Sequence, residues 1–125
     1  MVIEGKEMRI EMDGKIYHCA LDITMSYISG KWKTVILWYL RKEPRRFSEL
    51  NRQIPQITEK MLSLQLKELE TDGIVSRTIY AEVPPRVEYA LTDFGKTMLP
   101  MLEEIAAWGR ALAKSKGQMV EKAGG

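Results

Sequence analysis

The feature that most constrains this chain is a capped helix that leads directly into a short hairpin, over residues 57–91. Thr58 can accept hydrogen bonds from the free amide groups of a first helical turn. At the other end, Asp72 is followed by Gly73, which can take the left-handed conformation that helix termini favour. Three leucines between them recur at the spacing of one buried helical face: Leu62, Leu66 and Leu69. A helix is therefore predicted over 58–72.

Two β-rich runs follow that helix, at residues 75–80 and 87–91. The turn between them contains Pro84 and Pro85, which lack the amide proton that a strand ladder requires. The segment therefore predicts two antiparallel strands joined by a stiff, projecting turn over 82–86.

Composition restricts the chain to one compact domain. A length of 125 residues is too short for several domains. The apolar fraction of 45% is enough for a hydrophobic core. With one cysteine and one histidine, neither a disulfide framework nor a zinc site is expected. No apolar stretch approaches the roughly 20 residues that cross a bilayer, and the opening segment carries acids where a signal peptide would be apolar. We expect a cytoplasmic protein without metal, cofactor or membrane partner.

The N-terminal third predicts a hairpin and two helices. Apolar and polar residues alternate about Asp13-Gly14, a strong signal for a tight turn, so residues 1–18 are expected to form a hairpin or arm. One helix is expected over 20–28 and another over 31–40. The inner side of the second is expected to hold five residues: Trp32, Val35, Ile36, Tyr39 and Leu40.

A short strand and a short helix are expected just before the capped helix. Arg46-Phe47 can form the strand, and Ser48 is the expected N-cap of a helix over 49–53. That helix would bury Leu50 and Ile54, before a turn that contains a proline.

This order of elements matches an α+β winged helix-turn-helix with a two-stranded wing, whose second helix enters the major groove of duplex DNA. The charge distribution is consistent with a nucleic-acid partner. Residues 31–86 hold 11 Lys and Arg against 7 Asp and Glu, a net charge of +4, whereas the remainder of the chain has a net charge of −2. A solvated surface with scattered ion pairs explains the same excess equally well, so charge alone does not select a function.

The outer face of the helix over 58–72 is the candidate for base contacts. Side chains advance about 100° per residue along a helix. Four lie opposite the leucines: Lys60, Leu64, Lys67 and Thr71. Ser63 and Met61 lie on the two flanks. An exposed Leu64 is often incidental, but beside two lysines it can contact thymine methyl groups.

Four motifs occur in order along the chain: GKW after the first helix, the RFSEL segment, KMLSLQLKELE in the capped helix and EVPPRVEY in the hairpin. Together they resemble the HxlR-type winged helix regulators, which are related to the MarR group. The resemblance covers roughly residues 19–113. It implies a small dimeric transcription regulator, with Lys60, Ser63 and Leu64 in the groove and Arg86 in the wing. Leu64 departs from the polar residue more usual there, so the operator preference of relatives does not transfer.

Most of the affinity for DNA is expected from phosphate neutralisation, because few side chains reach base edges. The candidate DNA-binding residues are Thr58, Lys60, Met61, Ser63, Leu64, Lys67, Arg45, Arg46 and Arg86. Arg86 would lie where the wing meets a minor groove or its flanking phosphates. The alternative is that Arg86 pairs with Glu82 or Glu88, and we favour the DNA contact.

A helix is expected from Thr92 to residue 114, with Pro100 bending it. An apolar seam follows its length: Phe94, Met98, Met101, Ile105, Trp108 and Leu112. A second stripe lies beside the seam: Leu99, Leu102 and Ala106. Two stripes indicate two neighbours, namely the core and the same helix of a second subunit. The predicted organisation is an arm over 1–18, a DNA-binding domain over 19–91, a dimerisation helix over 92–114 and a flexible tail over 115–125.

Cys19 is the residue with reactive chemistry to consider. It precedes an expected helix start, where the helix dipole favours a thiolate. Some members of the HxlR-type family, which this chain resembles, use a cysteine near this position to sense oxidants or electrophiles. With one thiol per chain, oxidation would have to form an intersubunit bond, a mixed disulfide or an adduct. The alternative, an inert residue packed beneath the helix, is favoured.

An enzyme is not expected, because no catalytic group assembles. His18 and Cys19 are sequence neighbours whose side chains should diverge, and Gly30-Lys31 lacks the rest of a phosphate-binding loop. A winged helix used purely as a protein-interaction module is a further alternative. The sequence therefore predicts a homodimeric, sequence-specific regulator of transcription that binds a palindromic duplex, with space for a small-molecule effector between the terminal helix and the DNA-reading domain.

Overall fold

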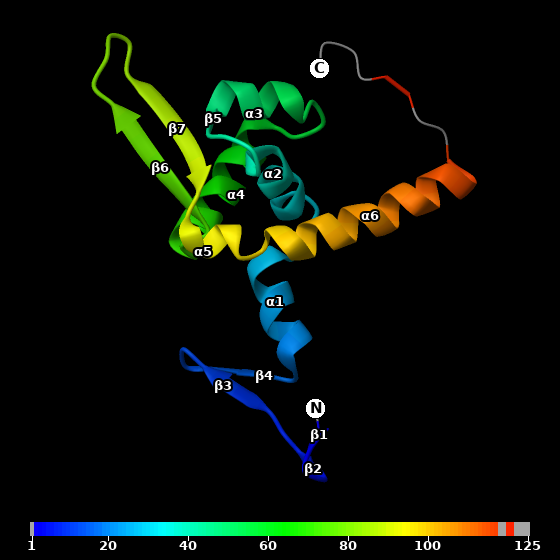
Figure 1. The fold of residues 1–125 in the computed structure, drawn as a ribbon. Coiled ribbons are helices and arrows are strands. Elements are labelled where there is room, and N and C mark those ends of the chain that lie inside the picture. Colours follow the sequence, from blue (N-terminus) through cyan, green and yellow to red (C-terminus); the bar gives the residue numbers. More distant parts are fainter. Residues whose placement is uncertain (1, 118–119, 122–125) are drawn as a thin grey trace. The chain divides into compact units, whose positions relative to one another are not determined.

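The computed structural model describes residues 2–117 and 120–121, and the chain divides into two compact units after Lys31. The second unit contains the longest strands of the protein and the helices that pack with them (Figure 1). The DNA-binding domain predicted over 19–91 straddles this division. Its N-terminal boundary stays a prediction.

Two tight hairpins open the N-terminal unit. β1 (Val2–Ile3) pairs with β2 (Lys6–Glu7), and β3 (Ile10–Met12) pairs with β4 (Lys15–Tyr17), both antiparallel. Asp13 and Gly14 have φ angles of 50° and 76°, as the two centres of a type I′ turn require, which confirms the hairpin predicted there. The first hairpin turns in the same way at Glu4-Gly5, and sequence analysis missed it because glutamate is not typical of that turn.

One helix completes this unit. α1 (Ala20–Ile28) has the bounds that the sequence predicts, and Cys19 is its N-cap residue. The backbone N–H of His18 donates to Asp22 Oδ2 at 3.1 Å, and this carboxylate complements the positive end of the helix dipole.

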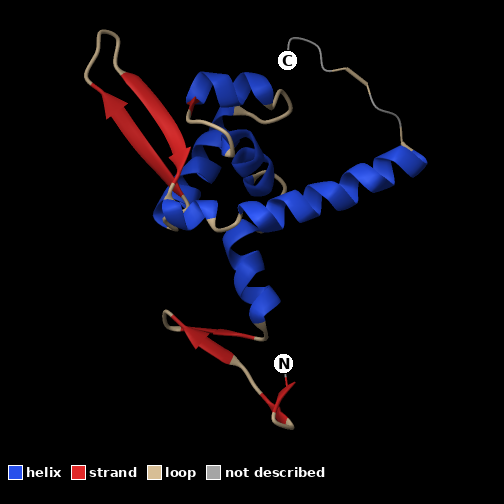
Figure 2. Cartoon of the chain, viewed as in Figure 1, coloured by secondary structure: helices blue, strands red, loops and turns tan. Residues whose placement is uncertain are grey.

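Three helices and a three-stranded antiparallel sheet form the core of the second unit (Figure 2). The helices are α2 (Lys33–Leu40), α3 (Phe47–Gln53) and α4 (Glu59–Thr71). The strands are β5 (Arg45–Arg46), β6 (Val75–Tyr80) and β7 (Arg86–Leu91), in the order β5-β7-β6. This arrangement confirms the predicted α+β winged helix-turn-helix, in which β6 and β7 form the wing. The residues buried deepest are Ile36, Leu37, Leu50, Leu62, Leu66, Leu69, Ile74 and Val75.

The inner face of α2 differs from the prediction. Leu37 is fully buried, whereas Trp32, Val35 and Tyr39 are only partly covered. The helix begins at Lys33, and its buried residues follow the spacing of one helical face: Lys33, Ile36, Leu37 and Leu40. The large aromatic side chains suggested a different face, but the leucine fills the core and the aromatic residues lie at its edge.

The start of α3 also differs. Arg46, not Ser48, is its N-cap residue, because the backbone N–H of Arg46 donates to Glu49 Oε1 at 2.8 Å. The strand correspondingly lies at Arg45–Arg46, and Ser48 is exposed within the first helical turn. Leu50 and Ile54 are buried as predicted.

The C-terminal segment forms two helices, α5 (Asp93–Lys96) and α6 (Leu99–Lys116), where the sequence predicts one bent helix. Pro100 lies in the first turn of α6, where its missing N–H removes no helical hydrogen bond, so it starts a helix instead of bending one. α6 continues past the expected end at residue 114. Of the flexible tail predicted over 115–125, residues 118–119 and 122–125 lie outside the described part of the chain.

Candidate nucleic-acid interface

The N-terminus of α4 is fixed by the predicted cap. Thr58 Oγ1 accepts a hydrogen bond from the backbone N–H of Met61 at 3.0 Å. At the other end Gly73 has a φ of 75°, and the N–H of Ile74 donates to Leu69 O at 2.9 Å. Both ends of the helix are therefore held by short-range contacts that its own sequence supplies.

The two sides of α4 have opposite character. Leu62, Leu66 and Leu69 are buried in the core. The predicted contact residues on the opposite side and its flanks are all exposed: Thr58, Lys60, Met61, Ser63, Leu64 and Lys67. Leu64 has 49% of its surface exposed, which is unusual for a leucine on a helix whose other leucines are buried. The structure thus presents two hydroxyls, two ammonium groups and two apolar side chains to solvent along α4 and its N-cap.

An ion pair that the sequence analysis did not predict links α4 to α2. Lys33 of α2 is buried, and its Nζ lies 3.3 Å from Glu68 Oε2 on α4. A buried lysine needs an anionic or polar partner, because removing an ammonium group from water is costly. The available signal was the spacing of Lys33, Ile36 and Leu40, which places the lysine on the inner face of α2.

Glu68→Ala is expected to destabilise the protein by about 1–3 kcal/mol, because Lys33 would be left buried without its carboxylate. Lys33→Met should be neutral or slightly stabilising, since an apolar side chain can replace a buried ion. Urea unfolding of both variants tests this asymmetry, with Glu70→Ala as the matched control on an exposed site of α4. Equal unfolding midpoints for the Glu68 and Glu70 variants would rule out a structural role for the pair.

The two arginines of β5 differ in availability. Arg46 is exposed. The Arg45 side chain is mostly covered, its Nη1 lies 2.9 Å from Glu43 Oε1, and its Nε donates to Tyr39 O at 3.3 Å. Arg46 is therefore the residue of this pair whose side chain is presented to solvent.

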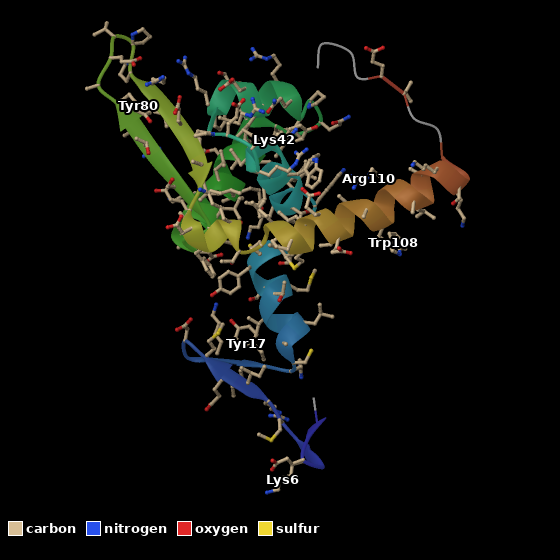
Figure 3. All side chains as sticks on the ribbon, viewed as in Figure 1. Lys6, Tyr17, Lys42, Tyr80, Trp108 and Arg110 are labelled. Carbon is tan, nitrogen blue, oxygen red and sulfur yellow. The ribbon has the colours of Figure 1, made fainter. Side chains whose placement is uncertain are left out.

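Arg86 is the first residue of β7, next to the turn of the wing. Its side chain contacts two carboxylates and an aromatic ring of the same hairpin. Its guanidinium lies 3.3 Å from Glu82 Oε1 and 3.5 Å from Glu88 Oε2. The same group stacks on the ring of Tyr80, 4.0 Å from the ring centroid, and Figure 3 shows Tyr80 near the end of β6. Arg86 therefore forms both of the ion pairs that the sequence offers as the alternative to a DNA contact. Whether Arg86 also contacts DNA stays a prediction.

A separate apolar surface runs along α6. Ile105, Trp108 and Leu112 are 51%, 72% and 41% exposed, whereas Leu102 of the adjacent stripe is buried. Trp108 and Arg110 project from opposite sides of the helix (Figure 3). Of the remaining seam residues, Phe94 of α5 is exposed, and Met98 and Met101 are partly covered. A row of large apolar side chains in water is typical of a protein–protein interface.

Cys19 is a partly covered free thiol at the N-cap of α1. Within the described ranges 2–117 and 120–121, no group of three or more His, Cys, Asp or Glu residues is arranged to hold a metal ion. In the same ranges, no helix combines the length and apolar character of a membrane span.

Comparison with known proteins gives consistent results. A family model described as HxlR-like helix-turn-helix matches residues 27–117. An HTH-type transcriptional regulator of Methanothermobacter thermautotrophicus is 42% identical over 113 residues, covering 90% of this chain and 86% of that protein. Another from Halalkalibacterium halodurans is 59% identical over 87 residues, covering 69% of this chain and 77% of that protein.

Two solved structures extend this similarity to the fold. The redox regulator HypR in its oxidized form matches with a TM-score of 0.73 and 42% identity, covering 82% of this chain and 100% of HypR. The reduced form of the transcriptional regulator YodB from Bacillus subtilis matches with a TM-score of 0.65 and 36% identity, covering 72% of this chain and 89% of YodB.

Proposed function

The chain belongs to the HxlR-like helix-turn-helix family and is a DNA-binding regulator of transcription, and we propose that it binds a palindromic duplex as a homodimer, with α4 of each subunit in a major groove. The exposed face of α4 carries this proposal. That face is polar and basic around Leu64, while the other face is anchored in the core by three leucines. A helix so anchored can lie in the groove without losing its own packing.

The contact residues divide by chemistry. Lys60, Lys67 and Arg46 are exposed cations suited to phosphates. Met61, Ser63 and Leu64 lie where side chains reach base edges, and Leu64 fits a thymine methyl group. Thr58 caps α4 through its oxygen and keeps a hydroxyl proton that can be donated to a phosphate.

The proposed dimer uses the apolar surface of α6. In a two-fold dimer, Ile105, Trp108 and Leu112 of one subunit would cover the same residues of the other. The two α4 helices would then lie about 34 Å apart, which is one turn of the DNA duplex. This geometry explains why a small monomer would expose so large an apolar row.

Lys60→Ala is expected to reduce the slope of log affinity against log salt concentration by about 1, because one phosphate contact is lost. Fluorescence anisotropy with a bound duplex, measured at several salt concentrations, gives this slope. Lys116→Ala, at the end of α6, is the control with the same loss of charge and should leave the slope unchanged. Equal slopes for both variants would exclude the proposed position of α4. Failure of the wild type to retain any duplex at low salt would favour a protein-interaction module instead.

A second candidate function is thiol-based regulation through Cys19. It is favoured by the similarity to HypR, whose structure is described as that of a redox regulator, and by the position of the thiol at a helix N-terminus. Because the chain has one cysteine, the oxidised product would be an intersubunit disulfide, a mixed disulfide or an adduct.

Treatment with diamide is expected to change the affinity of the wild type for its duplex at least about tenfold if Cys19 is the sensor, a free-energy difference of about 1.4 kcal/mol. Cys19→Ser should bind DNA normally and should not respond. Mass spectrometry of the treated protein identifies the thiol product. An unchanged affinity after complete modification of Cys19 would remove the sensing function and leave DNA binding intact.

A further inference from the structure

Side-chain contacts, in addition to backbone strand pairing, hold the two strands of the wing together. Tyr80, the last residue of β6, pairs directly with Arg86, the first residue of β7. Glu88 follows two positions later on the same face of the sheet, and Glu82 lies in the turn. The Arg86 guanidinium therefore joins the turn, the start of β7 and the end of β6 through three contacts. We call these four residues the wing clasp.

The wing clasp leaves little of Arg86 for another ligand. The side chain is 28% exposed, and its Nε is buried without a hydrogen-bond partner among the described residues. One nitrogen faces Glu82 and the other faces Glu88. The planar guanidinium contacts two carboxylates with its two terminal nitrogens and stacks on an aromatic ring. Both kinds of contact are ones that arginine makes especially well.

The charge of the wing clasp also opposes a phosphate contact. Arg86 carries one positive charge and the two glutamates carry two negative charges, so the group has a net charge of −1. The two carboxylates repel an approaching phosphate and so reduce the attraction that the Arg86 guanidinium alone would exert on it. The same turn also presents an apolar side chain to solvent, since Val83 is fully exposed.

Accepting the proposed function as a premise, we infer that Arg86 is a positioning residue of the wing and not a phosphate contact. It holds residues 81–85 in one conformation, so that the apolar tip at Val83 meets the DNA without first having to be ordered. Pre-ordering a loop increases affinity because the entropy loss precedes binding. The salt dependence of binding then comes from α4 and β5, not from the wing.

The substitution Arg86→Lys separates the two roles. Lysine keeps the charge that a phosphate contact needs, but it has no planar fork for two carboxylates and a ring. A positioning role predicts that Arg86→Lys and Arg86→Ala weaken binding to a similar extent, about tenfold, and that both keep the wild-type salt slope. Arg77→Lys is the control, because Arg77 is an exposed arginine on β6 of the same hairpin and should tolerate the change.

A second measurement uses the free protein and needs no DNA. Hydrogen exchange at the amide of Glu82, which donates to Tyr80 O at 2.9 Å, should be at least about tenfold faster in both Arg86 variants than in the wild type, because the turn opens more often. Thermal unfolding checks that the variants fold. The inference is overturned if exchange is unchanged, or if Arg86→Ala lowers the salt slope by about 1 while Arg86→Lys binds like the wild type. If the wild type binds no duplex, the proposed function fails, and the exchange rates still decide the role of Arg86.

Discussion

Replacing Trp108 by aspartate is expected to leave the protein monomeric and to weaken its binding to a palindromic duplex by at least about 100-fold. Trp108 is 72% exposed in the single chain, so the charge does not disturb the core. In the proposed dimer the same side chain is buried against a second subunit, where an unpaired carboxylate is strongly unfavourable. Without the dimer each half-site is bound separately, and the advantage of linked binding is lost.

Ala107→Asp is the matched control for this prediction. Ala107 is the preceding residue of α6, it is exposed, and it lies away from the apolar seam. The control should remain dimeric and bind DNA normally, because it introduces the same charge on a solvent-facing side. Sedimentation equilibrium gives the subunit stoichiometry, and anisotropy gives the affinity. A Trp108→Asp variant that remains dimeric at micromolar concentration would show that α6 is not the interface.

Gly95→Ala is expected to destabilise the protein by about 3 kcal/mol, the upper end of the usual cost of overpacking. A Cβ atom at Gly95 would overlap the carbonyl oxygen of Ile74, which belongs to the backbone and cannot rotate away. Relief would require α5 to move from the junction between α4 and β6. That movement would break the contacts of Thr92, whose Oγ1 accepts from the Gly95 N–H at 2.9 Å and donates to Gly73 O at 2.5 Å.

Gly109→Ala provides the comparison. Gly109 lies within α6, and a Cβ there meets no atom within 4 Å. Alanine should stabilise the helix by roughly 0.5–1 kcal/mol, because it restricts the unfolded chain more than glycine does. Thermal unfolding should therefore show a large fall in Tm for the Gly95 variant and a small rise for the Gly109 variant. Similar Tm values for the two variants would mean that α5 is not held as the structure indicates.

The segment from Thr58 to Leu91 could be predicted well because each of its elements carries its own local signals. The threonine cap, the leucine spacing and Gly73 define α4, and the prolines locate the turn between β6 and β7. These signals depend on neighbouring residues along the chain, which a sequence displays directly.

Features that depend on packing were predicted less well. The sequence did not distinguish Leu37 from the aromatic residues of α2, because several apolar residues compete for one inner face. Nor did it predict the break between α5 and α6, which follows from the cap at Thr92 and the position of Pro100 in a first turn. Both outcomes depend on which surfaces of the chain meet.

The candidate site shows the same division. Helical spacing was sufficient to identify the exposed face of α4. The environment of Arg86 was not decided by the sequence, because Glu82, Glu88 and a DNA phosphate are all suitable partners for arginine. The register of β6 and β7 brings Tyr80 and both glutamates around the guanidinium, and that arrangement requires three-dimensional geometry.

Selection of bound fragments from a pool of random duplex DNA tests the central claim most directly. If α4 lies in the major groove of a dimer, the wild type should select a palindrome with half-sites about 10 base pairs apart. Leu64→Ala should select the same palindrome with a weaker preference at one symmetric pair of positions. Recovery of no common sequence by the wild type, or of an unaltered consensus by variants across the exposed face of α4, would contradict the claim that this helix reads DNA.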